Sequence, residues 1–145
     1  MAIPAIRHHT DPFEKVWLQF PVRGDDRGSL IALEQTLNVP FDIKRVYYIF
    51  GTKEGVVRGM HAHRDLEQVA ICVAGACRFT LDNGSARQDF FLDRPDIGLH
   101  IGPMVWREMS DFTDDCVLMV LANKHYDEQD YIRDYGQFLK LARAS

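Results

Sequence analysis

Several features are missing from this sequence, and each absence removes a class of protein. No apolar run approaches the roughly 20 residues that a membrane-spanning helix needs. The first nine residues lack the apolar core of a secretion signal. The formal net charge is −4, so electrostatics favours neither a nucleic acid nor an anionic membrane as partner. We therefore expect a cytoplasmic protein that binds neither.

Paired cysteine spacing is also missing. The three cysteines, Cys72, Cys77 and Cys116, are odd in number and form no CxxC motif. Each lies within or beside an apolar run, which is typical of reduced core residues. Their pattern agrees with a reducing, cytoplasmic compartment.

The residues present predict one all-β domain over 1–145, with an N-terminal arm over 1–15. About nine short apolar or alternating runs are separated by turn residues, as in a β-sandwich or barrel. We expect Tyr48 and Phe50, which share one of these runs, and Trp106, which lies in another, to be packed in the core. Five residues at helical spacing predict one C-terminal helix over 128–143. The main expected strands are Trp17–Val22, Leu30–Glu34, Ile43–Phe50 and Cys116–Ala122.

The segment Arg58–Glu67 carries the most informative chemistry. His61 and His63 are two residues apart, so in a strand they share one face. Two imidazoles on one face can bind a metal or transfer protons. Glu67 lies four residues after the second histidine and is a possible third ligand.

The pattern His-x-His-x3-Glu resembles the first motif of the cupin superfamily, and this resemblance implies an antiparallel β-barrel (jelly roll). Metal-binding cupins carry a histidine ligand after a Pro/Gly turn in their second motif. Here that turn is Gly102-Pro103, and Arg107 stands at the matching position. Arginine stays protonated and cannot ligate a cation. We therefore favour a metal-free pocket, while His61, His63 and Glu67 keep a metal-dependent alternative open.

Arginines near the histidines indicate an anionic ligand, because guanidinium binds phosphate in a bidentate manner. Arg58 adjoins the histidine strand, and Arg45, Tyr47 and Arg107 are candidates to reach the same pocket. Arg58 has the opposite strand parity to His61. It must therefore enter the pocket at the start of the strand or through a β-bulge.

Further segments that carry a family pattern occur in order: Asp26–Leu30, Pro40–Phe50, Arg58–His63, Gln68–Val69, Gly98–Ile101, Trp106–Phe112 and Tyr126–Arg133. Together they resemble the dTDP-sugar 3,4-ketoisomerase family (WxcM-like, FdtA/QdtA-type cupins). The resemblance implies conversion of dTDP-4-keto-6-deoxyglucose to its 3-keto isomer through an enediol, without a redox cofactor. The product would enter dideoxy-aminosugar synthesis for surface polysaccharides such as lipopolysaccharide O-antigen or S-layer glycan.

The family resemblance also implies roles for single residues. His61 would be the base at carbon, and His63 would move protons between the oxygens. Arg58 would bind the pyrophosphate, while Tyr47 and Arg45 would position nucleotide or sugar.

Three further expectations concern the surroundings of this site. Arg107 and Arg27 would influence which face of C4 is reprotonated. Glu67 would orient a histidine or an arginine. Such enzymes form homodimers with exchanged N-terminal strands, and the segment 17–33 is compatible with that.

Three other functions remain open at this point. One is a metal-dependent cupin, either a dioxygenase or a sugar isomerase. Another is a dTDP-sugar 3,5-epimerase, because Arg58-Gly59-x-His61 resembles the active-site strand of that group. The third is a sugar-sensing module without catalysis, although no DNA-binding segment accompanies the domain.

Overall fold

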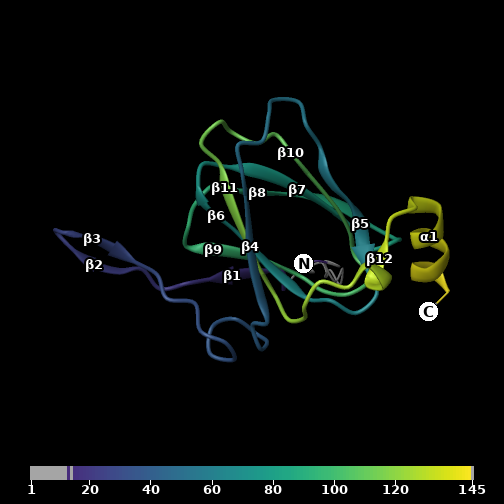
Figure 1. Cartoon of the computed structure of the whole chain (residues 1–145), viewed down its shortest axis with the longest axis horizontal. Coiled ribbons are helices and arrows are strands. Elements are labelled where there is room, and N and C mark those ends of the chain that lie inside the picture. The colour runs from purple at the N-terminus through teal and green to yellow at the C-terminus, as the bar shows by residue number, and fades with distance from the viewer. Residues whose placement is uncertain (1–12, 14, 145) are drawn as a thin grey trace, which may run out of the picture.

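Two five-stranded antiparallel sheets face each other and form the body of the protein (Figure 1). The computed structural model describes residue 13 and residues 15–144, so the expected arm over 1–15 lies almost entirely outside the described residues. The first sheet has the strand order β1-β9-β6-β11-β4, and the second has the order β12-β5-β10-β7-β8. The elements are β1 (Trp17–Gln19), β2 (Arg23–Asp25), β3 (Gly28–Leu30), β4 (Arg45–Phe50), β5 (Arg58–His63), β6 (Gln68–Ala74), β7 (Cys77–Asp82), β8 (Arg87–Leu92), β9 (Ile97–Ile101), β10 (Trp106–Ser110), β11 (Val117–Ala122), η1 (Glu128–Asp130), β12 (Tyr131–Ile132) and α1 (Tyr135–Arg143).

The main core lies between the two sheets. Strand β6 is apolar on both faces, because both are covered. Ala70 and Cys72 face the second sheet, whereas Val69 and Ile71 pack under the irregular segment 31–43 on the outer side. The expected all-β jelly-roll architecture with a C-terminal helix is confirmed.

The hairpin β2–β3 projects away from the two large sheets (Figure 1). Its tip is the turn Asp26-Arg27. Large apolar side chains on it stay exposed, such as Val22 (52%) and Leu30 (59%). The strand expected over Leu30–Glu34 is wrong, since only Leu30 belongs to a strand.

The helix expected over 128–143 begins only at Tyr135, so the prediction is wrong for residues 128–134. Residues 128–130 form a 3₁₀ turn, and the strand β12 pairs Tyr131 with His63 in β5. The Asp134 side chain accepts a hydrogen bond from the Gln137 amide and caps the helix. A pairing with β5 therefore replaces the first helical turns and brings Tyr131 to the histidines.

Strand β4 is an edge of its sheet, and this position overrides two expectations about packing. Tyr48 (63%) and Phe50 (68%) are exposed in the single chain, so their predicted packing is wrong. Trp106 is buried, as expected. Among the described residues, no helix is long and apolar enough to cross a membrane.

Candidate active site

A cleft of about 310 Å³ opens beside the histidine strand, at one end of the space between the sheets. Among the described residues, three arginines contribute to its wall, and no carboxylate does. This distribution makes the cleft electropositive in a protein whose net charge is −4. The lining residues are Arg45, Tyr47, Ile49, Arg58, Gly59, His61, Met109, Tyr131 and Arg133.

A β-bulge brings both Arg58 and His61 to this cleft. The pairing of β5 with β10 shifts register between Arg107 and Glu108, next to residues 59 and 60, which both have positive φ (83° and 58°). An added Cβ at Gly59 would lie 3.0 Å from the Arg107 carbonyl oxygen. The bulge changes the parity of the strand, so the irregularity expected for Arg58 is present.

His61 carries a free basic nitrogen at neutral pH. Its Nδ1 lies 3.1 Å from the Gly59 carbonyl oxygen, which can only accept, so Nδ1 holds the proton. Nε2 has no hydrogen-bond partner in the described part of the chain. Burial, and next the charge of Arg107, lower the pKa of His61 to about 4. The ring is therefore neutral and able to accept a proton.

His63 lies behind His61, and their ring centroids are 4.9 Å apart. The predicted shared face of the two histidines is confirmed, but His63 is only 1% exposed and does not line the cleft. Its Nδ1 lies 3.0 Å from Asp130 Oδ2, while its buried Nε2 has no partner. Burial and the Arg107 charge lower the pKa of His63, and the Asp130 carboxylate opposes that shift.

Asp130 and Tyr131 are residues that sequence reasoning missed. Asp130 also accepts hydrogen bonds from the backbone amides of Asp65 (2.9 Å) and Leu66 (3.3 Å), which fixes its carboxylate. The Tyr131 ring lies 4.9 Å from His61 and 4.4 Å from His63. Both residues belong to a segment that carried the family resemblance, but we assigned that segment to a helix.

Arg107 lies beneath the histidines and is 2% exposed. It donates to Gln68 Oε1 at 2.5 Å and to the Val105 carbonyl at 3.0 Å. Burial lowers its pKa to about 10, so it remains a cation at neutral pH. Gln68 in turn donates to the Tyr47 hydroxyl at 3.1 Å. One hydrogen-bonded chain therefore links the buried charge to the wall of the cleft.

Two arginines on the wall have distinct surroundings. The Nε of Arg45 is buried without a hydrogen-bond partner, and its guanidinium lies over the Tyr47 ring at 5.2 Å. Arg133 stacks on Tyr131 at 4.2 Å and is paired with Glu128 at 2.8 Å. Arg45 thus has unused hydrogen-bonding capacity for a ligand.

His63 and Arg107 lie behind the wall of the cleft, and two further predicted site residues, Glu67 and Arg27, are not at the cleft within one chain. Glu67 accepts a hydrogen bond from His100 Nε2 at 2.9 Å, so it orients a histidine, but neither catalytic candidate. Arg27 is 86% exposed on the hairpin tip and is paired with Asp25.

The proposed metal ligands do not converge. In the described part of the chain, only Cys72, Cys77 and Cys116 bring three ligand atoms within 4.8 Å of one another. His61, His63 and Glu67 therefore lack the geometry that a three-ligand metal site requires.

The sequence of the chain matches one family model and one curated relative. The family model FdtA (WxcM-like, C-terminal) matches residues 14–143. A curated relative from Aneurinibacillus thermoaerophilus, TDP-4-oxo-6-deoxy-alpha-D-glucose-3,4-oxoisomerase, is 58% identical over 116 residues, which are 80% of this chain and 84% of the relative.

Two solved structures are similar along nearly their whole length. A 3,4-ketoisomerase from Helicobacter canadensis has 48% identity and a TM-score of 0.85, covering 88% of this chain and 96% of that one. QdtA from Thermoanaerobacterium thermosaccharolyticum, a 3,4-ketoisomerase, was solved as a histidine-to-asparagine variant with TDP-4-keto-6-deoxyglucose. It has 43% identity and a TM-score of 0.87, covering 88% and 93%.

Proposed function

The chain belongs to the FdtA (WxcM-like, C-terminal) family, and from this membership we propose that it is a dTDP-sugar 3,4-ketoisomerase. It converts dTDP-4-keto-6-deoxyglucose to the 3-keto isomer, as an intramolecular oxidoreductase. The observation that carries the proposal is the cleft itself, where a neutral histidine with a free Nε2 faces three arginines. Such a cleft suits a substrate with an anionic diphosphate and an acidic C–H bond.

The reaction needs one base at carbon and a proton exchange between two oxygens. The C4 ketone acidifies the C3 proton, which His61 Nε2 removes to give an enediolate. A proton then returns at C4, and the hydroxyl proton at C3 moves to the C4 oxygen. No electrons leave the substrate. The Gly59 carbonyl stabilises the transient imidazolium through Nδ1–H.

Two buried side chains assist the reaction. Arg107 acts on the negative enediolate, and His63 acts on the protons of the substrate oxygens. The Arg107 cation lies on the strand beside His61 and favours the negative enediolate over the neutral substrate. We propose that His63 exchanges protons with the substrate oxygens from behind His61. Its unpartnered Nε2 is the available acceptor, and Asp130 holds its other nitrogen protonated.

Deuterium incorporation tests the reaction class. In D2O, the 3-keto product is expected to carry deuterium at C4, observed by NMR of dTDP-4-keto-6-deoxyglucose incubated with the protein. Deuterium at C3 and C5 would instead identify a 3,5-epimerase. Binding of the sugar nucleotide without exchange at any carbon would support a sensing module and contradict the proposal.

The diphosphate is expected to bind at Arg58, on the exposed start of β5. Arg58→Ala should weaken dTDP binding by roughly 10- to 100-fold, because one charge-assisted contact contributes about 1.5–3 kcal/mol. Calorimetric titration with dTDP measures this loss, and Arg64→Ala, on the turn after β5, is the control. Unchanged affinity in Arg58→Ala would remove this residue from the phosphate site.

We propose that the protein is a homodimer with exchanged N-terminal strands. The hairpin β2–β3 extends from the body and leaves an apolar groove of about 510 Å³, whose wall includes Ile71, Val73 and Met119 on the outer sheet face. A second copy of this chain has a matching hairpin to fill that groove. The exchange would also bring Arg27 to the cleft of the partner.

Mixed dimers test this arrangement. His61→Asn and Arg27→Ala homodimers should each be impaired, whereas co-refolded heterodimers should regain activity, since one of their two sites is then complete. Light scattering gives the oligomeric state. A monomeric protein, or no recovery in proven heterodimers, would contradict exchange through Arg27.

Arg27 and Arg107 would then act on the substrate from two chains. We propose that they influence which face of C4 receives the proton. The three free cysteines agree with a reducing cytoplasm. The 3-keto product has the chemistry that an aminotransferase consumes, which would place the enzyme in dideoxy-aminosugar synthesis for O-antigen or S-layer glycans.

A further inference from the structure

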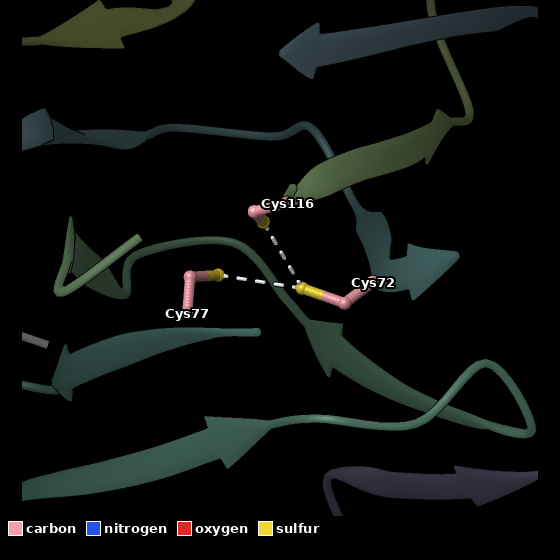
Figure 2. Close-up of side chains that lie close together, drawn as sticks. All are labelled: Cys72, Cys77 and Cys116. Carbon is pink, nitrogen blue, oxygen red and sulfur yellow. Dashed lines mark hydrogen bonds between the residues drawn. The ribbon is translucent and has the colours of Figure 1, made fainter. Parts of the chain in front are cut away.

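Three cysteine side chains meet in the main core between the two sheets, away from the candidate active site. Cys72 lies on β6, Cys77 begins β7, and Cys116 directly precedes β11 (Figure 2). Cys72 Sγ lies 3.6 Å from Cys77 Sγ and 3.7 Å from Cys116 Sγ. All three residues are at most 4% exposed. The chain has three cysteines in total, and all of them are in this cluster.

The surrounding backbone fixes the three sulfur positions. The turn at Gly75 (φ +64°) lies so close to the segment 113–116 that an added Cβ would be 2.7 Å from Cys116 Cα. Thr113 joins the two segments, because its amide donates to the Ala76 carbonyl and its hydroxyl accepts from the Ala76 amide, both at 2.9 Å. The cluster is therefore preorganised rather than assembled by a ligand.

The sulfur spacing suits one ion bound to all three atoms. The three sulfur atoms all lie within 4.8 Å of one another, so one ion with metal–sulfur bonds of ~2.3 Å can reach all of them. Cys72 follows Gln68 by four residues along the strand, which places the cluster ~13 Å from the active-site network. An ion in the cluster would not contact the substrate.

Charge selects the class of ion. All three sulfurs lie in the apolar core between the two sheets, where an uncompensated charge has no partner. Three thiolates around a monovalent or divalent ion would leave a net negative charge in an apolar core, which is costly. Zinc also takes a fourth ligand, and no His, Asp or Glu among the described residues joins this group. A trivalent ion with three thiolates is neutral and three-coordinate.

We propose that Cys72, Cys77 and Cys116 form a buried trithiol site for a trivalent thiophilic ion of the arsenite class. Arsenous acid is uncharged at neutral pH, so it enters an apolar site without an ionic desolvation penalty. Three As–O bonds break and three As–S bonds form. Each thiol proton leaves with one hydroxide as water, so three waters are released. No oxidation state changes.

Native mass spectrometry of the full chain with sodium arsenite tests this site. We expect one adduct whose added mass equals one arsenic atom less three hydrogens, together with a Tm increase of about 5 °C or more at ~100 times the dissociation constant. An adduct that retains a hydroxyl group uses only two thiols and would overturn the proposal. So would the lack of any adduct, or three-thiol binding of zinc or copper(I) in preference to arsenite.

Matched variants separate the site from general core effects. Cys77→Ala is expected to lose the three-hydrogen adduct while keeping ketoisomerase activity, since it is remote from the cleft. Leu118→Val alters the same core, keeps all three thiols, and should keep the adduct. Persistence of the adduct in Cys77→Ala would refute the assignment. If Cys77→Ala does not fold, the mass of the adduct on the wild-type protein still distinguishes binding to three thiols from binding to two.

Discussion

Replacing His61 with asparagine is expected to lower the ketoisomerase rate by about 10²–10⁴-fold, the usual contribution of a positioned general base. Asparagine keeps a polar group near the Gly59 carbonyl but cannot accept the C3 proton. The cleft retains its three arginines, so dTDP should bind with near-normal affinity. The expected signature is a lost kcat with an almost unchanged dissociation constant.

Single-turnover NMR in D2O and calorimetric titration with dTDP measure these two quantities. Glu67→Gln is the control, because Glu67 is bound to His100 and does not line the cleft. It should keep most of its activity, whereas a metal mechanism that uses Glu67 predicts a large loss. Full activity in His61→Asn would refute the role of His61 as base.

The sequence predicts the central part of this site because strand periodicity is local. His61 and His63 share a face by alternation alone, and the parity of Arg58 requires the bulge that β5 contains. The apolar run Cys116–Ala122 similarly predicts the inner strand β11. These features depend on residues within a few positions of one another.

Features that depend on distant contacts are predicted poorly. Tyr131 falls four residues before Tyr135 and fits a helical face, but pairing with β5 places it in a strand. Asp130 approaches His63 across 67 residues of sequence. Local spacing contains no signal for such a contact, so the carboxylate that orients the second histidine was missed.

Edge positions and partner surfaces are a second source of error. Tyr48 and Phe50 have the composition of a buried strand, yet β4 is an edge and exposes them. Arg27 was assigned to the site, but in one chain it lies on a remote hairpin. An exchanged dimer would account for the extended hairpin β2–β3 and for the distance between Arg27 and the cleft of its own chain. Sequence periodicity does not distinguish a surface that is exposed to solvent from one that binds a second copy of the chain.

Replacing Asp130 with asparagine is expected to reduce kcat by about 10²-fold or more, although Asp130 does not touch the substrate. The Oδ1 of asparagine can keep the hydrogen bond to the Asp65 amide. Its NH2 group would then face His63 Nδ1, where a carboxylate now accepts. His63 would shift its proton to Nε2 and lose the basic nitrogen proposed for proton exchange.

The ratio of C3 exchange to product formation separates this positioning role from a structural one. The carboxylate stabilises the protonated form of His63, so its loss lowers the pKa of that histidine further. The imidazolium then becomes rarer at every pH, and proton return should slow relative to proton removal. Exchange at C3 should therefore exceed product formation in the variant, measured as deuterium washed into unreacted substrate.

Asp65→Asn provides the control, since Asp65 is exposed in the same loop and forms a surface ion pair with Lys124. Such pairs contribute little to stability, so activity and Tm should stay near normal. Asp130→Asn is expected to fold with a Tm within a few degrees, because its shape and one backbone contact are kept. Equal losses of exchange and product formation, or a collapse of Tm that explains both, would contradict a proton-directing role for Asp130.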